Sequence, residues 1–553
     1  MLHILLLASV AQLARAARPN VLMISSDSMD GRVLDPDQHI GRSVPMPHLR
    51  ALAARGTNFV GAYTPSPVCG PSRACALTSR FVSDLGVWNN YQEIASCPSC
   101  PGGVDPGCEK LYGLPQCQAW AAQFPVPSDL FKAFVDAGYT VDIIGKVDIG
   151  AGVHQRFNSS DPGSDHTGPE ARTVPRGAGL LRNSMAWAGW SADTNAPTAW
   201  NGDNATTARM VAWLAGRVAE QAAAPSDAPP FFAYAGINIP HPPFATTPEW
   251  LALVNRSNIH PPWLGATHPY DVHMTVSKGC AENATTHATR MEVRAVYLAM
   301  CAQADAFHGA MMDALGPLAN NTIILYWSDH GEMAFEANQV LKDTFREPSA
   351  RVPLIWAGPG IAAGRTIASP VSLLDIWPTF SELLGLAPPP GARGFSLAPQ
   401  MAAAAPPSRG DHPGLATGMF FAENSDTGAF MLRSGDLKLL RYGHSFPWFA
   451  GYASQLFNVS SDPLETEDLA PAHPALVAQL EAALGAALGV DVDAVDAAVM
   501  RNDQFIYREY LMAGKSPAQQ RELLQGTYKG FDDADWQKVV LWNATEPTSA
   551  GRG

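Results

Sequence analysis

Two apolar segments far apart in the chain each end in a carboxylate. Residues 19–27 read Pro-Asn-Val-Leu-Met-Ile-Ser-Ser-Asp, and residues 322–332 read Thr-Ile-Ile-Leu-Tyr-Trp-Ser-Asp-His-Gly-Glu. A continuous apolar run of this length is typical of a strand buried on both faces of a parallel sheet. Sites in open α/β sheets form at the carboxyl ends of such strands. Asp is also a common strand terminator, so two strands that each end in an acid could be a coincidence.

The rest of the chain alternates between strand-like and helical segments. Strand-like runs lie at 140–145, 231–237 and 352–357, and helical patterns include 207–223 and 291–315. This alternation predicts an α/β fold with a largely parallel sheet flanked by helices. The chain has 553 residues, more than one hydrophobic core usually holds, so we expect a second domain.

Composition indicates where that second domain begins. An Ala/Pro-rich stretch at 391–414 is expected to be a linker or loop. It would separate a catalytic domain at 17–390 from a smaller C-terminal domain with a tail at 415–553. Within the latter, residues 430–442 read as a hairpin and residues 474–488 as an amphipathic helix.

The segment Cys69-Gly-Pro-Ser-Arg73 carries a candidate nucleophile at the start of a predicted helix. Pro71 suits the first helical turn, because its missing N–H would have no partner there in any case. A nucleophile at a helix N-terminus lies in a field that favours developing negative charge, and Arg73 adds a fixed cation beside it. A lone cysteine in a secreted chain is by default half of a disulfide, but this pattern favours a catalytic role for Cys69.

These residues, followed by Leu77-Thr78, resemble the nucleophile signature of the sulfatases. The resemblance implies an alkaline-phosphatase-like fold, with a large mostly parallel mixed sheet and a smaller C-terminal domain that has an antiparallel sheet. It also implies that a formylglycine-generating enzyme oxidises Cys69 during synthesis. One hydroxyl of the hydrated aldehyde would attack sulfur, and the second would let the sulfated intermediate collapse. A thiol cannot do this.

The resemblance further implies a divalent metal between the nucleophile and the two strand ends. Its ligands here would be Asp27, Cys69, Asp329 and His330. Oxygen-rich ligation with one imidazole favours Ca²⁺, or Mg²⁺, over a zinc cage. Most sulfatases carry a second consecutive acid at the first strand end, where this chain has Ser28. Either Asp30 folds back or water fills the gap.

An incoming sulfate requires hydrogen-bond donors and cations. By resemblance the substrate-binding residues are Lys146, His241, His268 and Lys342. Of the two histidines we favour His268, from its His-Pro-x-Asp pattern, with His241 close behind. The usual histidine two residues after Lys146 is replaced by Asp148, which would have to act as the base for the diol.

Several short motifs are similar to the branch of the family that removes 2-sulfate from glucuronate, among them Asn238–Pro242 and Tyr297–Ala302. The resemblance therefore implies a sulfated sugar, with 2-sulfated glucuronate as the first candidate. Arg32 and Arg346 are candidates to bind its carboxylate. Two alternatives remain: a phosphate or phosphonate monoester hydrolase of the same superfamily, and a secreted, catalytically inactive sulfatase-like glycoprotein.

The N-terminal residues and the net charge limit which compartment and which binding partners are expected. Residues 1–16 read as a signal peptide with a small-x-small cleavage site at Ala14–Ala16. Sequons agree with a secretory route, lysosomal or extracellular, and lie at Asn158, Asn204, Asn255, Asn283, Asn320, Asn458 and Asn543. No apolar run reaches the about 20 residues of a membrane span. The net charge of −14 argues against nucleic-acid binding.

Four of the eight cysteines cluster in the Pro/Gly-rich segment 96–118. They are Cys97, Cys100, Cys108 and Cys117. A zinc knuckle is one interpretation, but in an oxidising compartment two local disulfides, with three possible connectivities, are favoured. Cys280 and Cys301 would pair or stay buried, and Cys75 would be a small core residue.

Overall fold

The computed structural model describes the chain in segments: residues 18–88, 90, 129–148, 201–225, 228–262, 268–280, 285–404, 410–421, 427–444, 452–508, 512, 514–527 and 531–546. The predicted signal peptide, the cysteine cluster from Cys97 to Cys117 and the sequons at Asn158 and Asn283 lie outside the described residues.

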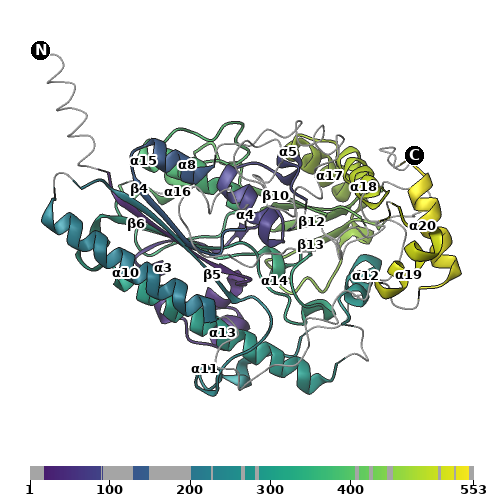
Figure 1. The fold of residues 1–553 in the computed structure, drawn as a ribbon, viewed down its shortest axis with the longest axis horizontal. Coiled ribbons are helices and arrows are strands. Elements are labelled where there is room, and N and C mark those ends of the chain that lie inside the picture. The colour runs from purple at the N-terminus through teal and green to yellow at the C-terminus, as the bar shows by residue number, and fades with distance from the viewer. Residues whose placement is uncertain are drawn as a thin grey trace, which may run out of the picture.

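A seven-stranded mixed sheet forms the centre of the larger part of the molecule (Figure 1). In spatial order its strands are β4 (Thr140–Gly145), β5 (Phe231–Pro240), β1 (Asn20–Asp27), β6 (Thr322–Ser328), β7 (Leu354–Ala357), β2 (Gly56–Phe59) and β8 (Arg365–Ile367). The first four are mutually parallel, and only β7 runs antiparallel to both of its neighbours. The expected mostly parallel mixed sheet is confirmed. Because β1 and β6 are adjacent, their carboxyl ends lie side by side.

Helices cover both faces of this sheet (Figure 1), which explains why its strands are apolar without alternation. Leu22 and Ile24 of β1 face one layer, whereas Val21 and Met23 face the other. The first layer holds α3 (Pro47–Ala54), α10 (Asn201–Ala223) and α13 (His287–Asp313), and the second holds α4 (Cys69–Thr78), α8 (Leu130–Asp136) and α15 (Ile376–Leu384).

A four-stranded antiparallel sheet forms the smaller part, as expected. Its strands are β10 (Leu415–Phe420), β11 (Ala429–Ser434), β12 (Leu437–Tyr442) and β13 (Gln455–Asn458). Strands β11 and β12 are the predicted hairpin, and the predicted helix forms as α17 (Pro474–Leu488). Three more helices follow towards the yellow end of Figure 1: α18 (Val492–Ile506), α19 (Pro517–Thr527) and α20 (Asp533–Ala544).

The Ala/Pro-rich stretch is partly built into the fold. It contains the short helix α16 (Ala398–Met401), and both Leu397 and Met401 are buried in the core of the larger part. The domain boundaries at 390 and 414 stay predictions.

A buried ion cluster ties the small sheet to the larger part. On β12, Lys438 Nζ lies 2.8 Å from Glu347 Oε1 and 2.6 Å from Glu465 Oε1, and the three side chains are at most 3% exposed. The Tyr63 hydroxyl, from β3 (Ala62–Tyr63), donates to the same Glu347 oxygen at 3.0 Å. Burial opposes ionisation of Glu347, but Lys438, together with Arg351 and Arg433, outweighs burial and lowers the pKa of this carboxyl to about 2.

Replacing Lys438 with methionine is expected to destabilise the fold by about 3–5 kcal/mol, because two buried carboxylates lose their cation. Glu347 has a folded pKa of about 2 against an ordinary 4.5, so its contribution is present above that ordinary value and is lost as the pH falls towards 2. The stability difference from the parent should therefore be smaller at pH 3 than at pH 7. Denaturant unfolding at both pH values measures this.

The matched control is Lys132→Met. Lys132 and Asp136 form an ion pair on α8 whose side chains are 52% and 59% exposed, and such surface pairs contribute about 0–1 kcal/mol. A Lys438→Met protein that is as stable as this control at pH 7 would contradict the role given to the cluster.

The cysteines of the described core, other than Cys69, form no disulfide. Cys75, Cys280 and Cys301 are buried and unpaired, so of the two alternatives for Cys280 and Cys301 the structure shows burial.

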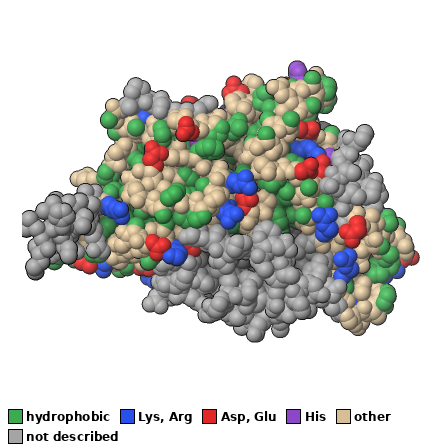
Figure 2. Space-filling view, turned by 90° about the horizontal axis from the view of Figure 1, so that it is seen from above, with side chains coloured by type: hydrophobic (Ala, Val, Ile, Leu, Met, Phe, Trp, Pro, Cys, Tyr) green, Lys and Arg blue, Asp and Glu red, His purple; other side chains and the backbone are tan. Residues whose placement is uncertain are grey.

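On the face in Figure 2, lysine and arginine side chains lie singly or in small groups among acidic and apolar ones. Among the described residues, no single helix is long and apolar enough to cross a membrane. Helix α17 and the start of α18 reach that length and apolarity only when they are taken together, and the two are bent by 63° relative to each other.

Candidate active site

Four side chains from three separate segments meet at the carboxyl ends of β1 and β6. Asp27 ends β1, Asp329 and His330 follow β6, and Cys69 begins α4. One candidate ligand atom from each lies within 4.8 Å of the others, and all four residues are buried. The Cys69 sulfur lies 3.2 Å from His330 Nε2 and 3.9 Å from Asp27 Oδ1. The structure thus brings the predicted ligand residues into one cluster.

The donors of this cluster fit a divalent cation. Two carboxylates offer hard oxygen ligands and His330 offers one nitrogen, a set that suits Ca²⁺ or Mg²⁺ better than a soft metal. Burial opposes a charge on His330, but Asp329 and Cys69 together outweigh it and raise the pKa of the imidazole to about 9. A ligating imidazole must be neutral, so a cation held here would displace that proton.

Ser28 and Asp30 show how the chain manages without a second consecutive acid. Ser28 adopts a left-handed conformation with φ of 70°, from which its Oγ donates to Asp27 Oδ1 at 2.9 Å. Asp30 does not fold back: its carboxylate is paired with Arg32, at 3.0 Å from Nε and 2.8 Å from Nη2. The structure therefore does not support Asp30 as the replacement for the missing acid.

Arg73 is fully buried and orients the carboxylates. Its Nε donates to Asp329 Oδ2 at 2.8 Å, and its Nη2 lies 3.5 Å from Asp27 Oδ2. Nη1 donates to the Tyr234 hydroxyl at 2.9 Å and to the Lys146 carbonyl at 3.0 Å. These contacts hold Arg73 against the carboxylates of two candidate ligand residues, Asp27 and Asp329.

Lys146 follows β4 and reaches the carboxylates of Asp27 and Asp148. Its Nζ lies 2.6 Å from Asp27 Oδ2 and 3.1 Å from Asp148 Oδ2. Burial opposes its charge, but Asp148 and Asp27 outweigh burial and raise the pKa of this ammonium well above its usual value. The Asp148 carbonyl lies only 3.3 Å from where a Cβ on Gly70 would stand. The backbone of Asp148 is therefore beside the residue that follows the nucleophile, and its carboxylate pairs with Lys146.

His241 and Lys342 form the other side of the site. His241 Nδ1 faces the Pro242 carbonyl at 2.5 Å, and its Nε2 lies 2.7 Å from Lys342 Nζ. A carbonyl only accepts, so Nδ1 carries the proton and Nε2 accepts from the lysine ammonium. Burial and the charge of Lys342 lower the pKa of His241 to about 4. The imidazole is thus neutral and holds Lys342 in place.

The segment that carries Lys342 has a strained backbone. Between residues 334 and 343, six non-glycine residues have positive φ: Ala334, Phe335, Ala337, Asn338, Leu341 and Asp343. Such strain persists where surrounding contacts impose it, often at functional sites. Glu332 Oε1 accepts from the N–H groups of Ala334 (3.1 Å) and Leu341 (2.5 Å), and Lys278 Nζ donates to the Lys342 carbonyl. Sequence reasoning missed Lys278 and Tyr234, because a single polar residue inside an apolar run carries no pattern.

His268 does not lie in the cluster. It caps α12 (Pro269–Ser277) through Nδ1, its Nε2 contacts the Ala453 carbonyl at 2.9 Å, and its ring stacks on Tyr442 with centroids 5.4 Å apart. The sequence favoured His268 over His241 as the substrate histidine, whereas the structure places His241 beside Cys69 and Lys342. The neighbouring Asp271 instead pairs with Arg346.

Mutation of each histidine in turn distinguishes the roles of His241 and His268. His241→Ala is expected to lower kcat/KM on sulfate esters by about 10²–10³, because Lys342 loses the group that orients it. His268→Ala should change kcat/KM by less than about threefold, with a modest loss of stability from the helix cap. Steady-state kinetics with Tm measured alongside decides between them. A large kinetic loss in His268→Ala alone would restore the original assignment.

Comparison with known proteins places this geometry in a family. The family model described as Sulfatase matches residues 19–386. The chain belongs to the sulfatase family. Curated relatives named Arylsulfatase K include those of Danio rerio (31% identical, 89% of this chain and 88% of the relative) and Homo sapiens (30%, 90% and 87%). The protein is therefore a sulfatase that hydrolyses sulfate esters.

Solved structures share the fold of this sulfatase. A phosphonate monoester hydrolase of Agrobacterium radiobacter matches with a TM-score of 0.60 at 22% identity, over 85% of this chain and 95% of that one. A 2-O GAG sulfatase matches with a TM-score of 0.58 at 20% identity, over 91% and 96%. At such identities the likeness establishes the alkaline-phosphatase-like fold and not the substrate.

Proposed function

We propose that this sulfatase removes sulfate from a sulfated sugar, using formylglycine made from Cys69 and one divalent cation, Ca²⁺ before Mg²⁺. The observation that carries the proposal is the buried meeting of Cys69 with Asp27, Asp329 and His330. Lys146 and Lys342 add two ammonium groups close to Cys69. Buried cations in such number suit a sulfate group better than a neutral ester.

The chain's own residues have distinct roles in this reaction. The hydrated aldehyde would supply the attacking hydroxyl and the cation would offset the sulfate charge. Lys146 and Lys342 bind sulfate oxygens, and Arg73 keeps the two carboxylates oriented. Asp148 accepts the proton of the nucleophile from its position beside Gly70. His241 directs the Lys342 ammonium towards the leaving oxygen.

The substrate that we propose is 2-sulfated glucuronate at a chain end. Support comes from the Arylsulfatase K relatives at about 30% identity, a branch that the motifs around Asp27, Lys146 and Asp148 resemble. The route that we propose is the secretory pathway to a lysosomal or extracellular location, with a formylglycine-generating enzyme as the partner during synthesis. The sequons and the predicted signal peptide support that route.

One comparison of substrates tests the proposal. We expect kcat/KM to be highest on 2-sulfoglucuronate-terminated oligosaccharides, compared with a sulfated hexosamine, an aryl sulfate and an aryl phosphate. If the phosphate ester were preferred, the monoester hydrolase alternative would replace the proposal. Mass spectrometry of the tryptic peptide 56–73 tests the modification, and an unmodified Cys69 after co-expression with the generating enzyme would favour an inactive glycoprotein.

A further inference from the structure

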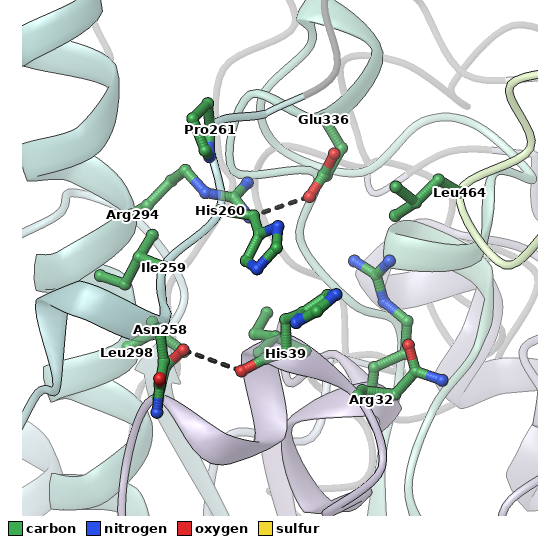
Figure 3. Close-up of a pocket in the computed structure, with 13 residues that line it drawn as sticks. Arg32, His39, Asn258, Ile259, His260, Pro261, Arg294, Leu298, Glu336 and Leu464 are labelled. Atoms are coloured by element: carbon green, nitrogen blue, oxygen red, sulfur yellow. Dashed lines mark hydrogen bonds and ion pairs between the residues drawn. The ribbon is translucent and has the colours of Figure 1, made fainter.

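A pocket with both apolar and charged lining residues shares none of them with the Cys69 cluster (Figure 3). Its volume is about 110 Å³. Arg32 of η1 (Gly31–Leu34) and Arg294 of α13 reach into it from two sides, and the rings of His39 and His260 stack beside them with centroids 3.6 Å apart. Gln38, next to His39 in the chain, also lines the pocket.

Both guanidinium groups are buried and keep unused donors. Arg32 is 3% exposed and binds Asp30 through Nε and Nη2, which leaves Nη1 without a partner among the described residues. Arg294 is 6% exposed; its Nη groups donate to the Ala334 carbonyl and to Glu336, while its Nε has no hydrogen-bond partner. Buried donors in proteins are almost always satisfied, so the buried, unpartnered Nε of Arg294 points to a ligand or ordered water.

The chemistry of the lining selects the class of ligand. A guanidinium presents a planar fork of N–H groups that matches a carboxylate or a sulfate. Arg346, the other arginine considered for a substrate carboxylate, is already paired with Asp271 and with the Glu465 carbonyl. Arg32 is thus the arginine of the two that retains free donors.

We propose that this pocket binds an acidic group of the glycan, a carboxylate or a sulfate, other than the sulfate that is cleaved. The inference rests on the proposed function for the nature of the substrate. The pocket acts as a subsite: it adds affinity for acidic chains and does not contact the reacting atoms. Neutral sugars or simple esters gain nothing from it.

The test changes the charge of the pocket at Gln38, one of its lining residues. The Gln38 side chain makes no cap hydrogen bond at the start of α2 (His39–Arg42), so Gln38→Glu alters charge and little else. Its carboxylate would compete for the arginine donors and weaken binding of a sulfated tetrasaccharide without a terminal 2-sulfate about fivefold or more. Gln38→Lys should strengthen the same binding. Calorimetry with this uncleaved ligand measures both.

The matched control is Gln479→Glu, the same charge change at an exposed position of α17. Equal affinity of Gln38→Glu and Gln479→Glu would overturn the proposal. So would inorganic sulfate binding as tightly as the tetrasaccharide, which would indicate an adventitious ion only. On cleavable chains Gln38→Glu should raise KM and leave kcat unchanged. Because the calorimetry needs no turnover, a failure of the proposed catalytic function would not be mistaken for a failure of the pocket.

Discussion

Cys69→Ala is expected to abolish sulfate-ester hydrolysis, with a loss of at least about 10³-fold in kcat, while the protein stays folded. The physical reason is that covalent catalysis depends on a nucleophile with no substitute nearby. Every other polar group within reach of the Cys69 sulfur is itself a candidate ligand or is paired: His330 lies 3.2 Å away and Asp27 3.9 Å away. Alanine cannot be converted to formylglycine.

The control for this variant is on the same helix. Cys75 is also fully buried, in an apolar cluster with Phe81 and Leu374, and burial raises the pKa of its thiol above the usual range. Cys75→Ala should cost about 1 kcal/mol of stability and leave kcat near the parent value. Activity assays are paired with thermal unfolding of both variants. Residual activity near the parent level in a folded Cys69→Ala protein would sink the assignment of the nucleophile.

The cluster could be predicted from the sequence because local patterns encode its parts. Buried parallel strands read as apolar runs, and parallel strands that are neighbours bring their carboxyl ends together. Asp27 and Asp329 therefore follow from two strand ends, and Cys69 follows from a helix start with Pro71 in its first turn. The joining of these parts into one site came from the resemblance to the sulfatases, because the pairing of β1 with β6 is a contact between distant parts of the chain.

Local sequence patterns could not decide whether His241 or His268 lies beside the nucleophile. His241 and His268 both precede a proline and both suit a loop, so the sequence around each looks alike. What separates them is tertiary: β5 ends beside the cluster and carries His241 to Lys342, while α12 packs near β12 and ties His268 to Ala453. The pairing of Asp30 with Arg32, which removes a possible ligand, is likewise visible only in three dimensions.

The placement of charge explains how an acidic protein can act on an acidic substrate. The chain carries a net charge of −14, which repels a polyanion at long range. Lys146, Lys342 and Arg73 are nevertheless buried around the nucleophile, where low dielectric makes each positive charge count more than on the surface. Attraction therefore acts at short range, inside the site, and a pocket such as that at Arg32 would extend it along the chain of sugars.

Asp329→Asn should remove metal and activity together. It takes away one of two carboxylates in the cluster, and we expect at least a 100-fold loss of kcat, about 3 kcal/mol of transition-state stabilisation. Asparagine keeps the shape and one oxygen, so the N–H groups of Ser28 and His330 that donate to Asp329 Oδ1 retain an acceptor. Arg73 Nε, 2.8 Å from the other oxygen, loses its charged partner, so some loss of stability is expected as well.

The effect of a chelator on Tm separates the loss of metal binding in Asp329→Asn from its loss of stability. A cation that binds only the folded parent at 100 times its Kd stabilises it by about 2.7 kcal/mol, so chelator should lower the Tm of the parent and leave that of Asp329→Asn unchanged. Asp142→Asn on β4 is the control, since that carboxylate accepts from the Ile143 N–H outside the cluster, and this variant should keep both metal content and the chelator response. Full turnover of the chelator-stripped parent would rule out a catalytic metal. Full metal content in Asp329→Asn would instead show that Asp27, the residue at position 69 and His330 hold the cation without it.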